Sequence, residues 1–186
     1  MEIVNESMIE TIHAWLNDGK AIALPTDTVY GLILKASKDN EHVLKQIKQR
    51  PEDKPLPMVV SSVDELLELI EVPDRYLDVV KSNLPGGLTI VGNAKQDYGH
   101  PTLAVRVPNK PYLLESLKGI GPCWLTSANI SGQPACFTVD QVKATLSDRI
   151  GYIVDGPCIS NVASTIVSFV ADQPKILRQG ALKLDL

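Results

Sequence analysis

Two cations lie close together at Lys48 and Arg50, where both could bind one phosphate group. Lys48 is predicted to lie in the last turn of a helix, and Arg50 is held in an extended conformation because Pro51 follows it. The two side chains therefore leave the backbone in different geometries and can reach one space. Arginine can bind a phosphate through two parallel N–H bonds, and lysine adds a point charge. Cations at a helix C-terminus also complement the helix dipole, so a purely structural role stays open for this pair.

Hydroxyl-rich loops directly follow two short apolar segments that are predicted to be strands. Residues 25–31 (PTDTVYG) carry Thr26 and Thr28, and residues 126–132 (TSANISG) carry four hydrogen-bonding side chains before a glycine. Ligands of α/β proteins bind beyond the carboxyl ends of strands, and such side chains can hold a charged ligand together with backbone N–H groups. Ordinary turns have the same composition, so each loop alone is also consistent with a plain turn.

A further cation, Arg106, lies within a predicted apolar strand at residues 104–108 (AVRVP). Alternation places the two flanking valines on one face of the strand and the arginine on the other. An arginine buried without a partner is unfavourable, so Arg106 either faces water or lines a cleft. Ser164 and Arg178, near the C-terminus, add another hydroxyl and another cation.

Several common catalytic motifs are missing from the chain. It has neither a P-loop nor a dinucleotide-binding glycine motif, and it lacks the zinc-protease and serine-hydrolase signatures. The three histidines, His13, His42 and His100, are scattered. No residue therefore stands out as a general base.

The elements that must position these residues alternate irregularly between helix and strand. Helices are predicted over residues 7–18, 40–48, 62–70, 74–83, 111–117 and 138–146. Strands are predicted over residues 21–24, 57–61, 88–91, 103–107, 123–126, 152–154, 165–167 and 176–177. Ser7, Ser62 and Thr138 are predicted to begin helices with capping boxes, and Val43, Leu44 and Ile47 to face inward. The pattern predicts one layered α/β domain with a mixed sheet and flanking helices over residues 1–186.

Composition indicates a globular protein with no membrane segment and no disulfide framework. Hydrophobic residues make up 44% of the 186 residues, and no apolar run approaches the roughly 18 residues of a membrane helix. The three cysteines lack C-x-x-C spacing, and no basic region followed by an apolar stretch opens the chain, so we expect a cytoplasmic location. The formal net charge of −4 means that any anion site must be a local concentration of positive charge.

Taken together, these segments resemble one family, the YrdC/TsaC threonylcarbamoyl-AMP synthases. The matching strings appear in the family's order and cover about residues 20–180: residues 25–32 (PTDTVYGL), 48–51 (KQRP), 54–56 (KPL), 84–89 (LPGGLT), 106–108 (RVP), 126–132 (TSANISG), 164–167 (STIV) and 178–180 (RQG). One departure is Leu84 and Gly87, where the family often has W-P-G-P. The chain resembles the short, single-domain form of the family.

The resemblance implies a twisted α/β domain with a concave, basic active-site cleft. It implies a nucleotidyltransferase that converts L-threonine, bicarbonate and ATP into L-threonylcarbamoyladenylate and pyrophosphate. A tRNA threonylcarbamoyl transferase complex would then pass the group to tRNA, and direct contact with tRNA or double-stranded RNA belongs to the same expectation. A carbamate carboxylate is already ionised, so its attack on ATP needs no protein base, which agrees with the absence of an obvious one.

The resemblance also implies roles for individual residues. Lys48 and Arg50 would be catalytic. ATP would be bound by Lys48, Arg50, Ser127, Asn129, Ser164 and Arg178, with Mg²⁺ bridging the phosphates and no protein ligand assigned to the metal. Threonine would be bound by Thr26, Tyr30, Arg106 and Thr126, with Arg106 on its carboxylate.

Two alternatives stay open at this stage. A related carbamoyl-adenylate enzyme of hydrogenase maturation embeds this domain among zinc-binding and other modules, for which 186 residues leave little room. A non-catalytic RNA-binding module could also use a basic concavity. The acidic net charge and an aromatic content of 5% count against it.

Overall fold

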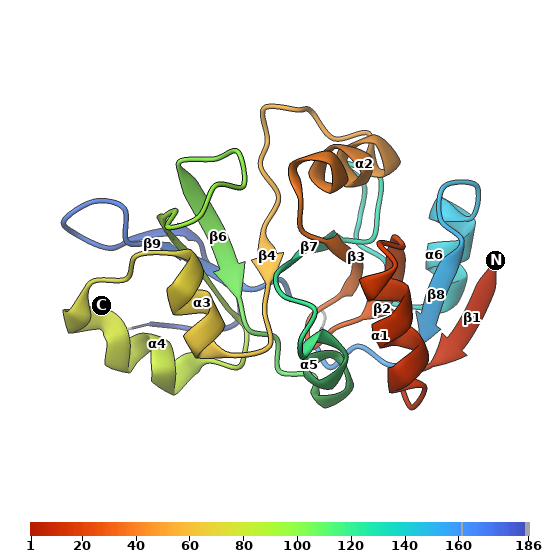
Figure 1. The fold of residues 1–186 in the computed structure, drawn as a ribbon, viewed down its shortest axis with the longest axis horizontal. Helices are drawn as coiled ribbons and strands as arrows, with labels where there is room; N and C mark the ends of the chain where they lie inside the picture. The colour runs from red at the N-terminus through yellow and green to blue at the C-terminus, as the bar shows by residue number, and fades with distance from the viewer. Residues whose placement is uncertain (161, 185–186) are drawn as a thin grey trace.

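A ten-stranded sheet runs through residues 1–160 and 162–184, the part of the chain that the computed structural model describes (Figure 1). The strands are β1 (Glu2–Asn5), β2 (Ile22–Pro25), β3 (Tyr30–Lys35), β4 (Met58–Val59), β5 (Leu88–Asn93), β6 (Thr102–Arg106), β7 (Cys123–Ser127), β8 (Tyr152–Asp155), β9 (Thr165–Ser168) and β10 (Lys175–Arg178). Their order across the sheet is β1-β8-β2-β3-β7-β4-β6-β5-β9-β10.

The sheet is twisted and mixed, as the sequence predicts. β3 pairs antiparallel with β2 and with β7, whereas β4 runs parallel to β6 and β5 runs parallel to β9. In the middle of the view in Figure 1, β4 and β7 pair with each other and join the two halves of the sheet. Loops that are far apart in the sequence therefore meet at the centre of the molecule.

Helices flank the sheet. They are α1 (Ile9–Asn17), α2 (Lys38–Lys48), α3 (Val63–Leu69), the 3₁₀ turn η1 (Asp74–Tyr76), α4 (Leu77–Asn83), α5 (Pro111–Leu117) and α6 (Val139–Leu146). α2 packs on β3, α3 on β6 and α6 on β8, and α1 packs on α5. None of the helices within the described ranges is long and apolar enough to cross a membrane.

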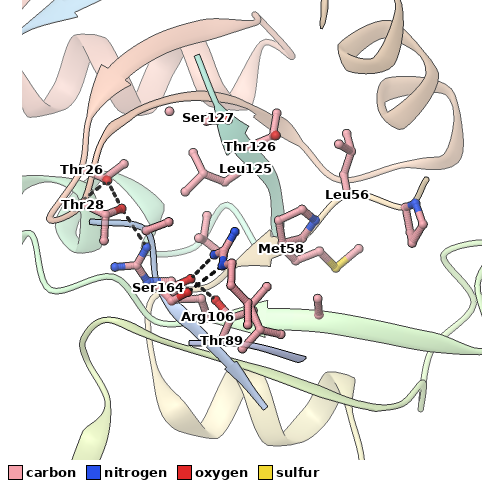
Figure 2. Close-up of a pocket in the computed structure, with 18 of the residues that line it drawn as sticks. Thr26, Thr28, Leu56, Met58, Thr89, Arg106, Leu125, Thr126, Ser127 and Ser164 are labelled. Carbon is pink, nitrogen blue, oxygen red and sulfur yellow. Dashed lines mark hydrogen bonds between the residues drawn. The ribbon is translucent and has the colours of Figure 1, made fainter. Parts of the chain in front are cut away.

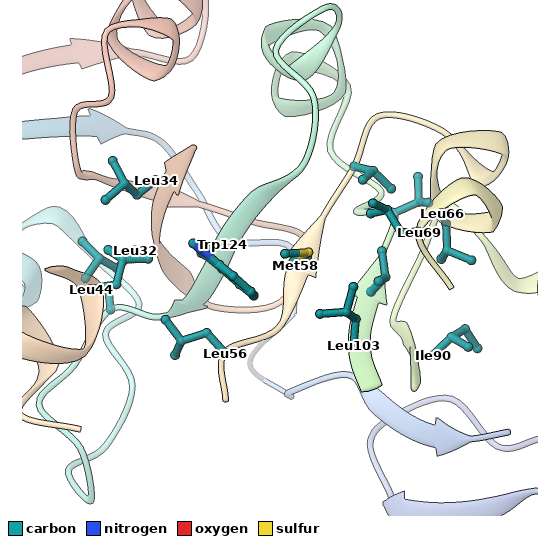
Figure 3. Packing of buried hydrophobic residues seen from close by; sticks show 14 of the residues in the cluster. Leu32, Leu34, Leu44, Leu56, Met58, Leu66, Leu69, Ile90, Leu103 and Trp124 are labelled. Carbon is teal, nitrogen blue, oxygen red and sulfur yellow. The ribbon is translucent and has the colours of Figure 1, made fainter. Parts of the chain in front are cut away.

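The largest hydrophobic core lies under the centre of the sheet (Figure 3). Trp124 of β7 and Met58 of β4 are fully buried there, and the Trp124 ring N–H donates to the Ser37 carbonyl at 2.8 Å. Around them pack Leu32, Leu34, Leu44, Leu56, Leu66, Leu69, Ile90 and Leu103. The core thus fixes α2 and α3 relative to the two central strands.

The predicted helix ends are confirmed in part. Ser62 and Thr138 cap their helices by accepting the N–H of the residue three positions later. The return bond of each predicted capping box is wrong by one residue, because Glu65 and Gln141 accept the N–H groups of Ser61 and Phe137 and not those of the cap residues. The prediction for Ser7 is wrong: α1 begins at Ile9 without a side-chain cap, because the Ser7 N–H and hydroxyl bind the side chain of Asn5 instead.

The inward face predicted for α2 is also partly wrong. Leu44 is buried, but Val43 is 39% exposed. The helix begins at Lys38, two residues earlier than predicted, and Ser37 caps it. Its buried face carries polar residues. Glu41, Lys45 and Lys48 occupy it because each has hydrogen-bond partners in the loops that the helix covers.

Two strands of the sheet, β1 and β3, were not among the predicted ones. The first residues of β3 belong to the 25–31 motif, so this segment was interpreted as a loop and the strand was not predicted. β3 forms an antiparallel hairpin with β2. The hairpin places the hydroxyl-rich loop at the end of two adjacent strands, which brings Thr26 and Thr28 over the sheet.

Candidate active site

A cavity of about 520 Å³ lies on the face of the sheet opposite the core formed with α3 (Figure 2). Along β6, Leu103 and Val105 enter that core, whereas Ala104 and Arg106 line the cavity. The predicted alternation around Arg106 is therefore confirmed, and this arginine lines a cleft.

The Thr-rich loop between β2 and β3 forms one wall of this cavity. The Thr26 hydroxyl donates to the Val29 carbonyl at 2.7 Å and accepts the Thr28 N–H at 3.0 Å, which closes the loop on itself. The Thr28 hydroxyl oxygen accepts Nη1 of Arg106 at 3.1 Å. The two hydroxyls thus connect the loop to the cation beneath it, as Figure 2 shows.

Arg106 is held by three partners and is only 6% exposed. Besides Thr28, its Nη2 donates to Asp27 Oδ2 at 2.7 Å and its Nε donates to the Gly86 carbonyl at 2.8 Å. Burial lowers the pKa of Arg106, and the Asp27 carboxylate acts in the opposite direction. Of the five N–H donors of a guanidinium group, two remain without a partner among the described residues and can serve a ligand.

A second arginine faces the same cavity from β10. Nε and Nη2 of Arg178 donate to the carbonyl and hydroxyl oxygens of Ser164 at 3.0 and 3.1 Å. The Ser164 hydroxyl in turn lies 2.8 Å from that of Thr89 (Figure 2). Arg106 and Arg178 line the same cavity, and repulsion from Arg178 adds to the effect of burial in lowering the pKa of Arg106. Two cations in one cavity suit an anion.

Lys48 and Arg50 border a smaller, polar cavity of about 220 Å³, and Arg50 lines both cavities. Lys48 is 2% exposed, and its ammonium donates to the carbonyl oxygen of Ser127 and to both oxygens of Asn129, at 2.8 and 2.9 Å for the latter two. Burial, together with the charge of Arg50, lowers the pKa of Lys48 to about 8. All three ammonium protons therefore hold the 127–129 loop, and Lys48 acts on the cavity through its charge.

Most of the predicted site residues come together. Thr26, Arg50, Arg106, Thr126, Ser127, Ser164 and Arg178 line the larger cavity, and Lys48, Arg50, Ser127 and Asn129 line the smaller one. Tyr30 lines neither cavity. Its hydroxyl lies 3.0 and 3.1 Å from the carbonyl oxygens of Gly156 and Val154, which ties the start of β3 to β8. The threonine contact expected of Tyr30 stays a prediction.

Other lining residues were not predicted as site residues. Thr28, Lys54 and Thr89 lie in strings that carry the resemblance, so their motifs could have pointed to them. Leu56, which adds apolar lining, likewise ends the 54–56 string. The apolar lining by Met58 has no signal in the sequence, because this side chain looks like an ordinary core residue. No group of three or more His, Cys, Asp or Glu side chains that could hold a metal ion occurs among residues 1–160 and 162–184.

The geometry agrees with a comparison of the sequence with known families. The family model Sua5_yciO_yrdC, described as "Telomere recombination", matches residues 14–180. The chain belongs to this family. The match covers both cavities and every predicted site residue, and it confirms the resemblance found in the motifs.

Members of the Sua5/YciO/YrdC family with curated names are similar along most of the chain. The threonylcarbamoyl-AMP synthase of Bacillus subtilis (strain 168) is 34% identical over 96% of this chain and 55% of its own length. A putative threonylcarbamoyl-AMP synthase of Mycobacterium leprae is 33% identical over 92% of this chain and 82% of its own length. The chain thus spans little more than half of the first of these relatives.

A solved structure of the family has the same fold. The crystal structure of P. abyssi Sua5 complexed with L-threonine superimposes with a TM-score of 0.91 at 30% identity, over 98% of this chain and 58% of that chain. The α/β architecture predicted from the sequence is therefore confirmed at the level of tertiary structure.

Proposed function

We propose that the chain is a threonylcarbamoyl-AMP synthase, which forms L-threonylcarbamoyladenylate and pyrophosphate from L-threonine, bicarbonate and ATP. The observation that carries the proposal is that Arg50, Arg106 and Arg178, from distant segments, line one cavity. A polyphosphate and a carboxylate together require several cations, and an acidic chain has no general reason to gather three in one place. The names of the family members support the same activity.

In this proposal different groups of residues in the cavity bind different substrates. Arg50 and Arg178 bind the phosphates of ATP, with Ser127 and Ser164 beside them, and Asn129 keeps Lys48 in place. Arg106 offers its two free donors to the threonine carboxylate, next to Thr26 and Thr126. The solved relative that is described as complexed with L-threonine supports a threonine site in this fold.

The chemical step needs positioning and charge more than proton transfer. The neutral amine of threonine first attacks the carbon of bicarbonate; a C–N bond forms and a C–O bond breaks as water leaves, which gives a carbamate. One of the ionised carbamate oxygens then attacks the α-phosphorus of ATP. A new O–P bond forms, the bond to the β-phosphate oxygen breaks, and pyrophosphate leaves with the electron pair. The charges of Lys48 and Arg50 stabilise that leaving group, and cations that the protein holds in place are an effective means of doing so.

Magnesium would enter this site with the phosphates of ATP, as the metal usually does. It would neutralise phosphate charge in the transition state. Oxygen donors suit the metal, and the Ser131 hydroxyl at the smaller cavity is buried with no hydrogen-bond partner among the described residues. The hydroxyls of Ser127 and Ser131 are the groups that could assist such an ion.

The proposed product is a reactive adenylate, so a second activity must consume it. We propose that a tRNA threonylcarbamoyl transferase complex does so, and that both act in the cytoplasm. RNA contact by this chain belongs to the same proposal.

The test is pyrophosphate release by the purified protein with ATP, Mg²⁺, bicarbonate and L-threonine. Release that requires both threonine and bicarbonate is expected. Arg178→Gln should lower kcat/KM for ATP by about a hundredfold, as loss of one charge-stabilising donor typically does. Arg106→Lys should instead raise KM for threonine, because a lysine cannot reproduce the forked donor set. Arg75→Gln, an exposed arginine outside both cavities, is the matched control.

Release that is indifferent to threonine would refute the proposal. Salt-dependent RNA binding without any nucleotide turnover would favour the RNA-binding alternative instead.

A further inference from the structure

An acidic side chain, Glu41, is buried on the face of α2 that covers the loop after the helix, and it is 5% exposed. Its Oε1 accepts the ammonium of Lys45 at 3.0 Å and the backbone N–H of Leu56 at 3.2 Å. Its Oε2 lies 2.7 Å from Nε2 of His100, in the loop between β5 and β6. Burial tends to raise the pKa of Glu41, but the hydrogen bonds from His100 and Lys45 outweigh it, so the pKa is lowered and the carboxylate is charged.

Lys45 extends this network along the same loop. It is 4% exposed, and its ammonium also donates to the carbonyl oxygen of Glu52 at 2.8 Å. The Glu41–Lys45 pair therefore binds the segment of residues 50–56 at two places, near its beginning and at its end. His100 connects the same pair to the loop between β5 and β6, and its ring packs edge-on against Trp124 of the central strand β7.

The bound segment is the one that holds Arg50 in place. Nε of Arg50 donates to the carbonyl of Lys54 at 3.1 Å, and its Nη2 donates to that of Pro55 at 3.0 Å. Both carbonyls lie between the two places where Glu41 and Lys45 hold the backbone. The direction of the Arg50 guanidinium, which lines both cavities, thus depends on how the 50–56 segment is held.

We propose that Glu41, together with Lys45 and His100, is a positioning group that aims Arg50 at the phosphate site. Stability alone gives no reason for these charges, since a buried ion pair can often be replaced by apolar side chains of similar volume without loss. What apolar side chains cannot do is accept the Leu56 N–H or donate to the Glu52 carbonyl. The inference rests on the proposed function for its triphosphate-binding readout and on the hydrogen bonds for its structural readout.

The test uses a double variant, Glu41→Leu with Lys45→Met. It removes both charges together, keeps the approximate volumes, and leaves no buried charge unpaired. Amide exchange at Leu56 should become faster, because Glu41 is the acceptor of that N–H. Affinity for inorganic triphosphate should fall about ten- to a hundredfold, the factor that one charge-assisted hydrogen bond contributes, while threonine affinity changes less.

Two further variants separate positioning from stability. Glu41→Gln keeps an oxygen that can accept the Leu56 N–H. This variant should therefore bind triphosphate more tightly than the double variant does. Leu146→Ala removes a fully buried side chain of α6, which packs on β8 and lines neither cavity, and should lower the melting temperature without changing triphosphate affinity.

Wild-type triphosphate affinity in the double variant, or unchanged exchange at Leu56, would overturn the inference while leaving the synthase proposal intact. A wild-type protein that neither binds triphosphate nor releases pyrophosphate would instead refute the proposed function itself.

Discussion

Raising the pH from 7.5 to 9.5 should weaken ATP binding by about twentyfold, because Lys48 loses its charge in that range. With a pKa of about 8, Lys48 is about three-quarters charged at pH 7.5 and only a few per cent charged at pH 9.5. Bound phosphates favour the charged form, so at pH 9.5 binding must take up about one proton at Lys48. The terminal phosphate of ATP titrates near pH 6 and adds little over this range.

The assay is isothermal titration with ATP in two buffers of different ionisation enthalpy, which counts the protons taken up. Lys48→Met is the matched control, since it keeps most of the length of the side chain and has no charge to lose. It should bind ATP more weakly at pH 7.5, with an affinity that is nearly independent of pH. A wild-type profile as flat as that of the variant would refute the assignment of the site charge to Lys48.

The lowered pKa of Lys48 also predicts that the free protein becomes more stable as the pH rises, whereas ATP binding becomes weaker. The pKa of Lys48 is about 8 in the folded state against 10.5 for an ordinary lysine. Between these values the unfolded chain binds more protons, so the contribution of Lys48 to stability rises with pH, by at most about 3 kcal/mol. Urea titrations of wild type and Lys48→Met between pH 7.5 and 10.5 should show this difference, and a constant difference would contradict it.

Three other changes have clear expected outcomes. Asp27→Ala leaves Arg106 buried without its counter-ion and should lower the free energy of unfolding by about 3–5 kcal/mol in urea titrations; a loss below about 1 kcal/mol would contradict this. Gly31→Ala places a Cβ 2.6 Å from Cδ1 of Leu125, which lines the larger cavity. This change should destabilise the protein by about 1–3 kcal/mol and weaken threonine binding. The control Gly87→Ala adds a Cβ in open space and should have neither effect. Burial raises the pKa of Cys123 to about 12, so iodoacetamide at pH 8 should modify it only after unfolding; rapid alkylation of the native protein would oppose that.

Much of the fold follows from local sequence signals. Ser62 and Thr138 cap helices by bonds that span three residues, and such bonds are visible in any sequence window. Alternation along β6 separates Val105 from Arg106 for the same reason, because the period of a strand is local. The prediction failed where a neighbouring element competed, as at Ser7, whose hydroxyl is taken by Asn5.

The types of the site residues, and the family to which the chain belongs, could be inferred from the sequence because short motifs indicate both. The contacts between these side chains could not be inferred from the sequence. That Arg106 is paired with Asp27, that Tyr30 faces β8, and that all the ammonium protons of Lys48 are engaged depend on side chains brought together by strand pairing. The buried carboxylate of Glu41 was invisible for the same reason: its partners, at residues 45, 56 and 100, meet only when α2 packs over the centre of the sheet.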